Sequence, residues 1–310
     1  MNNIALLTPG QGSQYVGMFK DLCDSYAKVN ELVKYANEIV GYPLSEICFN
    51  GPIEKLKETR YTQPALFIHS AAVYEIIKEN FQCSAVAGHS VGEYAALYIA
   101  EVLSFEDALN LVSLRGQLMF TIGEEISGTM FAVINLSNEK INEICNELTD
   151  AEKGLYVVPA NFNSPGQVVI SGSADHLRNN INIFKDAGAR MVKELQVSGA
   201  FHSPLMLPAQ TKLEEAINSI TFNNAAIPVY ANVTAEPQTD GEKLRKLLIK
   251  QLTSPVLWSQ TIENMHKNGI NKFIEIGAGS VLQGLVKKTI TGDNIELLGL
   301  EKVTDVESYR

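Results

Sequence analysis

The sequence predicts an α/β protein. Short apolar segments, typical of buried strands, alternate along the chain with longer segments whose apolar residues recur at helical spacing. A glycine-flanked serine, in Gly88-His89-Ser90-Val91-Gly92, stands between one such strand and an alanine-rich helix. The 310 residues, of which 45% are hydrophobic, are enough for one large domain or for a domain that carries an insertion.

The N-terminal part of the chain predicts two strands and three helices. The first strand, residues 4–7, ends at Thr8-Pro9-Gly10-Gln11-Gly12, whose glycines either turn the chain or bring main-chain N–H groups close to a ligand. Ser104 and Asp107 form a capping-box-like start for one helix. The further elements predicted here are a helix over 63–79, a strand over 84–87 and helices over 91–100 and 105–120.

A different order of elements follows, and it predicts an inserted unit. The pattern gives a strand at 129–135, a helix at 138–148, strands at 155–160 and 167–171, a helix at 174–187 and a strand at 190–196. This β-α-β-β-α-β order is the ferredoxin-like motif. We therefore predict that residues 128–197 form a small subdomain, inserted into a large domain made of residues 1–127 and 198–310. The large domain resumes with helices near 205–219, 241–252 and 280–289 and strands at 227–231 and 272–276.

Composition excludes several classes of protein. No apolar run approaches the roughly 18–20 residues that span a membrane, and no secretory signal is evident. The four cysteines lie far apart without a CxxC pair, which argues against structural zinc and favours a reducing, cytoplasmic setting. A formal net charge of −10 argues against nucleic-acid binding as the main task.

The segment around Ser90 fits G-x-S-x-G, the nucleophile elbow of hydrolase-like α/β domains with a parallel sheet core. In this turn the glycines avoid collisions with the neighbouring backbone, and the serine oxygen is exposed at a helix N-terminus, where negative charge is favoured. The alternative is a glycine-rich turn without a chemical role. The strand before the segment and the helix after it favour Ser90 as a nucleophile.

His202 is the candidate base among five histidines. It lies in QVSGAFHSPLM, between a predicted strand and a predicted helix, and strand ends are where α/β proteins gather their chemistry. The alternative is a structural loop histidine. The other four are predicted to pack in the core or at its rim (His69), to point away from Ser90 (His89) or to be solvated (His176, His266).

No third member of a triad is evident. Asp175 precedes His202, as the acid does in α/β-hydrolases, but it falls in the small subdomain. A main-chain carbonyl is the alternative, since it would fix the histidine tautomer without adding a charge.

Arg115 lies on the apolar face of a predicted helix. That face consists of Ala108, Leu111, Val112, Arg115, Leu118 and Met119. A buried cation is costly unless it is paired. The guanidinium therefore either reaches water, or forms a structural ion pair, or awaits a ligand carboxylate that it holds bidentately.

Taken together, these motifs resemble the malonyl-CoA:acyl-carrier-protein transacylases, which include stand-alone fatty-acid enzymes and trans-acting acyltransferases of polyketide synthases. The resemblance runs from end to end. Its landmarks are PGQGSQ (9–14), TQPAL (62–66), GHSVGEY (88–94), the helix with Arg115, NFNSPGQVVISG (161–172), AFHS (200–203), QLTSPVLW (251–258) and EIGAGSVLQGLVKK (275–288).

The resemblance implies a role for each matching residue. Ser90 would be the nucleophile, His202 the general base and acid, and Arg115 the clamp for the malonate carboxylate. The main-chain N–H groups of Gln11 and Val91 would form the oxyanion hole. Further residues implied near the site are Gln251, which helps to position the histidine, and Asn161 and Asn163, whose roles stay open.

The implied reaction is a two-step transfer of malonyl from malonyl-CoA, through an ester on Ser90, to the phosphopantetheine thiol of an acyl carrier protein. It implies no metal and no redox cofactor, and a monomer is the expected state. Phe201, in AFHS, resembles the malonyl-selective polyketide members, because a phenyl ring would crowd an α-methyl group. We therefore expect a trans-acting polyketide acyltransferase, with a housekeeping fatty-acid enzyme as the alternative.

Two other functions stay open from the sequence. An acyl hydrolase on the same scaffold would release acyl chains to water, although hydrolase relatives tend to lack the arginine. A carrier-docking module with a vestigial site would not need Ser90. The basic runs Lys243-Leu244-Arg245-Lys246 and Lys287-Lys288 are candidate docking sites for an acidic carrier, or else solvated helix faces.

Overall fold

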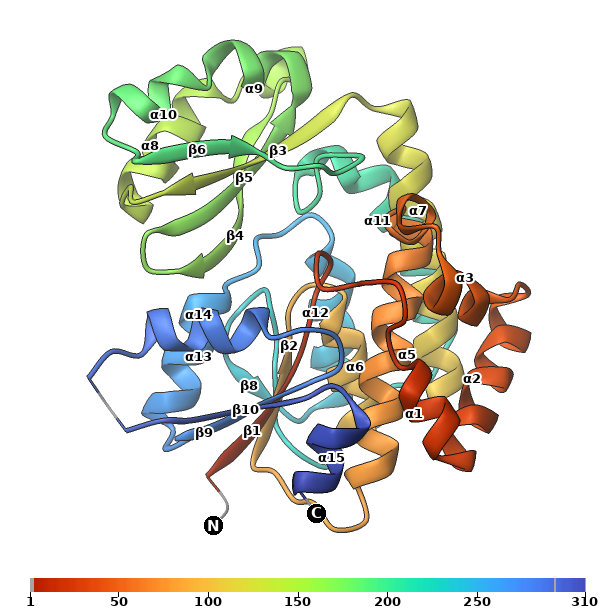
Figure 1. The fold of residues 1–310 in the computed structure, drawn as a ribbon. Helices are drawn as coiled ribbons and strands as arrows, with labels where there is room; N and C mark the ends of the chain where they lie inside the picture. Colours follow the sequence, from red (N-terminus) through yellow and green to blue (C-terminus); the bar gives the residue numbers. More distant parts are fainter. Residues whose placement is uncertain (1–2, 293, 310) are drawn as a thin grey trace.

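The computed structural model describes residues 3–292 and 294–309, and it confirms the α/β class. Within these residues the larger sheet has the strand order β10-β9-β1-β2-β7-β8, in which all neighbours are parallel except β7 and β8. Figure 1 shows the smaller sheet above it, with β4 on the side that faces the larger one. The strands of the larger sheet are β1 (Ile4–Thr8), β2 (Ala85–Gly88), β7 (Val229–Tyr230), β8 (Pro237–Gln238), β9 (Lys272–Ile276) and β10 (Glu296–Leu300).

Helices cover both faces of the larger sheet. Strand β1 is buried on both sides: Leu6 packs toward the core that holds α5, α6 and α7, whereas Ala5 and Leu7 pack toward α13 and α14. The helices of this part are α1 (Lys20–Ser25), α2 (Ala27–Val40), α3 (Leu44–Asn50), α4 (Ile53–Leu56), α5 (Thr59–Ile77), α6 (Gly92–Ile99), α7 (Phe105–Glu125), α11 (Leu207–Asn218), α12 (Gly241–Gln251), α13 (Trp258–Lys267), α14 (Val281–Thr289) and α15 (Val303–Tyr309). Among the described residues, no helix is both long and apolar enough to cross a membrane.

The smaller sheet is antiparallel, and its order, β4-β5-β3-β6, is that of a ferredoxin-like unit. Its helices lie on the face turned away from the larger sheet (Figure 1). Its elements are β3 (Gly128–Ile134), α8 (Asn138–Leu148), β4 (Val157–Ser164), β5 (Gln167–Ser173), α9 (Ala174–Asn180), α10 (Asn182–Asp186) and β6 (Met191–Glu194).

The single helix predicted over 174–187 is wrong, because the structure divides it into α9 and α10 at Ile181. The side-chain amide of Asn180 donates a 2.8 Å hydrogen bond to the carbonyl of His176. Such a side chain competes with the helical ladder for its acceptors, which favours an end to the helix at this point.

Helices α1 to α4, α13 and α15 had no prediction from the sequence. Helices α1 to α4 and α13 begin without a side-chain hydrogen bond to their first turn, a feature that they share with the predicted helices α5, α6 and α14. By contrast, Ser104 accepts a hydrogen bond from the N–H of Asp107, which confirms the predicted start of α7.

The two sheets are joined through β4. Asn161 forms a parallel bridge with Val256, a residue of the loop between α12 and α13. The N–H of Phe162 donates to the carbonyl of Val256 at 2.9 Å, and the N–H of Val256 donates to the carbonyl of Ala160 at 2.8 Å. These hydrogen bonds fix β4, the edge strand of the smaller sheet, to the loop between α12 and α13.

Candidate active site

The site lies at the carboxyl end of the parallel strands. Thr8 at the end of β1 is in register with Gly88 at the end of β2, so the loops that carry Gln11 and Ser90 leave the sheet side by side. Such edges are where open α/β sheets bind ligands. Arg115 arrives from α7, His202 from the loop before α11, and Gln251 from the last residue of α12.

Ser90 has the geometry of a nucleophile elbow. Its φ is 53°, in the left-handed region that a serine seldom adopts. A Cβ on Gly88 would lie 2.0 Å from the carbonyl carbon of Gly92, and a Cβ on Gly92 would lie 2.3 Å from the carbonyl oxygen of Thr8. Both positions therefore require glycine.

Asn232 holds this turn from the neighbouring strand end, just after β7. Its Oδ1 accepts from the Ser90 N–H at 2.7 Å, and its Nδ2 donates to the Gly88 carbonyl at 2.7 Å. Because both arms of the amide are used, the strained backbone of Ser90 is fixed on both sides.

His202 contacts Ser90 directly. Its Nε2 lies 2.7 Å from Ser90 Oγ, and its Nδ1 lies 3.0 Å from the carbonyl of Gln251 and 3.1 Å from that of Ser254. Since carbonyls only accept, the proton is on Nδ1, and Nε2 is free to accept from the serine hydroxyl. Burial and the Arg115 charge lower the pKa of His202 to about 3, so the ring is neutral at pH 7.

Arg115 is 1% exposed, so its head does not reach water. Its Nη1 donates to Gln63 Oε1 at 2.6 Å, and its Nη2 donates to Gln251 Oε1 at 3.0 Å and to Ser90 Oγ at 3.1 Å. Its Nε has no hydrogen-bond partner among the described residues. The cation is thus held by neutral amides beside the serine oxygen, an arrangement that suits an incoming carboxylate.

Gln251 joins this arginine to a buried acid. The Nε2 of Gln251 donates to Glu93 Oε2 at 2.8 Å and to the Ser90 carbonyl at 2.8 Å. Glu93 is 1% exposed, and burial raises its pKa to about 7. The main-chain carbonyl and the side chain of one residue therefore orient both His202 and Arg115.

Gln11 and Val91 line the cavity beside Ser90. The main-chain N–H group of neither residue has a hydrogen-bond partner among the described residues. Unpaired main-chain donors are what an oxyanion requires.

The cavity walls are mainly apolar. Phe201 is 5% exposed and lines the cavity, together with Met119, Met130, Leu195 and Val197. Asn161 also lines it, whereas Asn163 lies in an adjoining hollow, where its Oδ1 is 2.8 Å from His89 Nε2.

Comparison with known proteins identifies the family. A family model described as "Acyl transferase domain" matches residues 6–307. The chain belongs to this family.

Relatives of this acyl transferase domain carry the name predicted from the motifs. The chain is 43% identical to a malonyl CoA-acyl carrier protein transacylase of Haemophilus influenzae, over 100% of this chain and 97% of the relative. The crystal structure of an acyl carrier protein S-malonyltransferase from Vibrio cholerae is 39% identical, with a TM-score of 0.93 and full coverage of both chains. A type II polyketide synthase acyl-carrier protein in complex with its malonyl-transacylase matches at 37% identity and a TM-score of 0.92, over 98% of each chain.

The remaining histidines and Asp175 occupy different places in this acyl transferase domain. His69 is buried in α5, with its Nε2 2.9 Å from the carbonyl of Glu301. His89 lines the cavity beside Ser90, and its ring packs on Trp258 with ring centroids 5.3 Å apart. Asp175 is exposed and pairs with Arg178, so it is not a triad acid.

The prediction that His176 and His266 are solvated is wrong. Both side chains are half-buried, and one ring nitrogen of each lies within hydrogen-bond distance of a main-chain carbonyl, that of Leu148 or Ile270. Leu148 is the last residue of α8 and Ile270 lies in the loop after α13, and the local pattern around each histidine does not show these contacts.

Sequence reasoning did not single out four further residues of the site: Thr59, Gln63, Glu93 and Asn232. Gln63 and Glu93 stand inside the segments TQPAL and GHSVGEY, so the motifs themselves were a signal. Asn232 follows a predicted strand, where site residues gather. Thr59 carried no signal, because a threonine in the first turn of a helix is ordinary.

Proposed function

We propose that this chain moves a malonyl group from malonyl-CoA, through an ester on Ser90, to the phosphopantetheine thiol of an acyl carrier protein. The names of its relatives support this activity. The observation that carries it is the buried Arg115 guanidinium, 3.1 Å from Ser90 Oγ. A cation at this place favours an acyl group that ends in a free carboxylate.

In the first half-reaction Ser90 Oγ attacks the thioester carbonyl while His202 Nε2 takes its proton. The oxyanion that forms accepts hydrogen bonds from the N–H groups of Gln11 and Val91. The C–S bond then breaks, and His202 returns the proton to the sulfur of the departing CoA. The products are the malonyl ester of Ser90 and free CoA.

The second half-reaction reverses these roles. His202 takes the proton of the pantetheine thiol, and the sulfur attacks the ester carbonyl. The C–O bond breaks, and His202 protonates Ser90 Oγ, which restores the free site. Every proton and charge is handled by named residues, so the proposal includes no metal ion and no redox cofactor.

The resemblance of Phe201, in AFHS, to the malonyl-selective polyketide members leads us to propose a role in polyketide synthesis, with the enzyme acting in trans. The ring is buried in the cavity wall, where it would crowd a substituent on the α-carbon of the acyl group. A pocket discriminates against one methyl by about 1–3 kcal/mol, so selectivity for malonyl is incomplete. The rates of transfer to carrier proteins from polyketide and from fatty-acid synthesis, compared side by side, test this role; faster transfer to the fatty-acid carrier would contradict it.

Intact-mass spectrometry tests the proposed activity. Brief exposure to malonyl-CoA should add one malonyl group, and this adduct should be absent from Ser90→Ala. A folded wild-type protein that gains no adduct would exclude the transferase.

Arg115→Ala distinguishes the clamp from a structural role. It should slow malonyl loading far more than acetyl loading, because only malonyl carries a free carboxylate. Equal losses would make Arg115 structural. Rapid release of acetyl groups to water, with little malonyl adduct, would favour a hydrolase instead.

A further inference from the structure

A chain of hydrogen bonds runs from Arg115 to the loop that carries Gln11. Arg115 Nη1 donates to Gln63 Oε1 at 2.6 Å, and Gln63 Nε2 donates to Thr59 Oγ1 at 2.8 Å. Thr59 Oγ1 donates in turn to Gln11 Oε1 at 2.9 Å. Gln63 and Thr59 are each 1% exposed, so the bonds from Arg115 to Gln63 and from Gln63 to Thr59 are shielded from water, whereas Gln11 is half-buried.

The charge on Arg115 fixes the orientation of the Gln63 amide. A guanidinium only donates, so Gln63 must present its oxygen to Arg115 and its NH2 group to Thr59. The Thr59 hydroxyl accepts from Gln63, and Gln11 Oε1 is the acceptor that the described residues offer for its hydrogen. The second hydrogen of Gln63 points at Met119 Sδ, 3.1 Å away, so the amide has no alternative orientation. Bonds that run in one direction from a cation strengthen one another.

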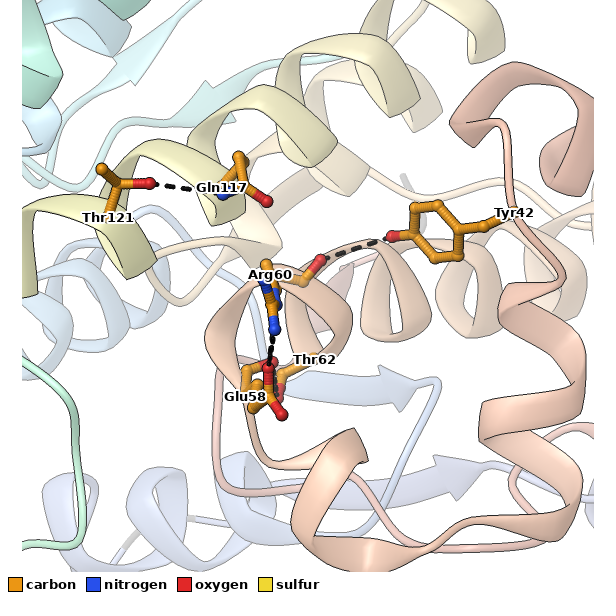
Figure 2. A network of polar contacts seen from close by, with 6 residues as sticks. All are labelled: Tyr42, Glu58, Arg60, Thr62, Gln117 and Thr121. Carbon is orange, nitrogen blue, oxygen red and sulfur yellow. Dashed lines mark hydrogen bonds and ion pairs between the residues drawn. The ribbon is translucent and has the colours of Figure 1, made fainter. Parts of the chain in front are cut away.

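Contacts on the first turn of α5 hold the main chain of Thr59 in place. Pro64 lacks an N–H, so the carbonyl of Arg60 loses its helical partner, and the hydroxyl of Tyr42 points at that carbonyl at 3.5 Å. Figure 2 shows this contact and the pairing of the Arg60 side chain with Glu58. On the inner side, Gly116 of α7 packs so closely that a Cβ there would lie 3.0 Å from the Thr59 carbonyl.

We propose that Thr59 and Gln63 are positioning residues that tie the oxyanion loop to the carboxylate-binding arginine. They hold the side chain of Gln11, and through it they place the Gln11 N–H beside Ser90. This inference rests on the proposed function. In this inference the side chain of Gln11 positions the loop, and the main-chain N–H of the same residue donates to the oxyanion.

Single-turnover loading of Ser90, followed by rapid quench and intact mass, tests this assignment. Thr59→Val keeps the shape of the side chain and removes the hydroxyl, so loading should slow about two- to tenfold for malonyl-CoA and acetyl-CoA alike. The concentration of malonyl-CoA at half saturation should stay within about twofold of the wild-type value. Thr59→Ser should restore the rate.

Two comparisons separate positioning from general damage. Thr62→Val is the matched control. Thr62 is also buried in α5, but its hydroxyl donates to the carbonyl of Leu56 and takes no part in the hydrogen bonds that link Arg115 to Gln11. Ser90 of the Thr62→Val protein should be loaded at the wild-type rate. Gln11→Ala removes the oxygen to which Thr59 donates, so the further change Thr59→Val should not lower the loading rate again. The double variant should therefore load no more slowly than Gln11→Ala alone.

Three results would overturn the assignment: wild-type loading by Thr59→Val, an equal loss in Thr62→Val, or fully additive losses in the double variant. A wild-type protein that forms no malonyl adduct would instead remove the proposed function itself, and the positioning role with it.

Discussion

Ser90 and His202 both have a main chain in the left-handed region, with φ of 53° and 56°. A non-glycine residue in such a conformation costs about 1–3 kcal/mol and persists only where its surroundings determine it. Asn232 determines it for Ser90, and the carbonyls of Gln251 and Ser254 hold the ring of His202. The strain brings the two side chains within 2.7 Å of each other.

Gln11 allows the main chain to be tested apart from the side chain. Gln11→Ala keeps the N–H and should slow loading of Ser90 by at most about tenfold, which corresponds to one neutral hydrogen bond. Gln11→Pro removes the N–H and should cost about 2.7–4 kcal/mol of transition-state stabilisation, if circular dichroism shows a folded protein. Similar loading rates in the two variants would contradict an oxyanion role for this loop.

The pKa of His202 predicts how loading depends on pH. A base acts when it is unprotonated, and the pKa of His202 is lowered from 6.5 to about 3, so the ring stays neutral well below pH 6.5. Protonation of His202 should therefore not slow malonylation of Ser90 between pH 8 and about 5.5, where an ordinary histidine would lose most of its activity. Glu93, whose pKa is raised to about 7, titrates within this range, so the profile is compared with that of Glu93→Gln. Arg115→Ala, tested with acetyl-CoA, should move the histidine limb upward, since the nearby charge is gone. A limb near pH 6.5 in both the wild type and Glu93→Gln would contradict the shift.

At the scale of elements, the site depends on how closely α6 approaches β1. The N–H of His89 donates to the Thr8 carbonyl at 3.0 Å, and the hydroxyl of Thr8 donates to the Gly92 carbonyl at 2.7 Å. No side chain fits between the two elements, which is why the elbow and the Gln11 loop stand next to each other.

Gly92→Ala tests this approach. Its Cβ would lie 2.3 Å from the Thr8 carbonyl oxygen, so the free energy of unfolding should fall by about 1–3 kcal/mol. Gly284→Ala is the control. Gly284 lies on the exposed side of α14, and a Cβ there would have no atom within 4 Å. The free energy of unfolding of this variant should rise by about 0.4–1 kcal/mol. Urea denaturation measures both, and equal midpoints would contradict the close packing.

For the whole molecule, the structure separates the two basic runs. Lys288 lies on α14, donates to Gln167 of β5 at 3.2 Å, and lines a hollow with Arg190 beside the smaller sheet. The other run lies on α12, where Arg245 pairs with Glu242 of the same helix. The first run lies on a helix that packs against β9 of the larger sheet and β4 of the smaller one, so we favour it for an acidic carrier.

Charge reversal should distinguish these surfaces. Lys288→Glu should raise the concentration of carrier protein needed for half-maximal transfer several-fold, and the effect should shrink at high salt because exposed charges are screened. Lys243→Glu, on the exposed side of α12, should leave the concentration of carrier protein needed for half-maximal transfer unchanged. Transfer from preloaded malonyl-Ser90 enzyme keeps CoA binding out of the measurement. Equal effects of both variants would show that only net charge matters.

The sequence by itself determined the α/β class, the ferredoxin-like order of the elements from β3 to β6, the elbow at Ser90 and the position of Arg115 on an apolar helix face. These features depend on neighbouring residues, because strand alternation, helical spacing and glycine-flanked turns are local. The partners of the site residues were decided only by the tertiary structure. Ser90 meets Asn232 across 142 positions, Arg115 meets Gln251 across 136, and Ser90 meets His202 across 112. Such contacts arise where separate strand ends and helices converge, and no local pattern specifies which oxygen a buried arginine will find there.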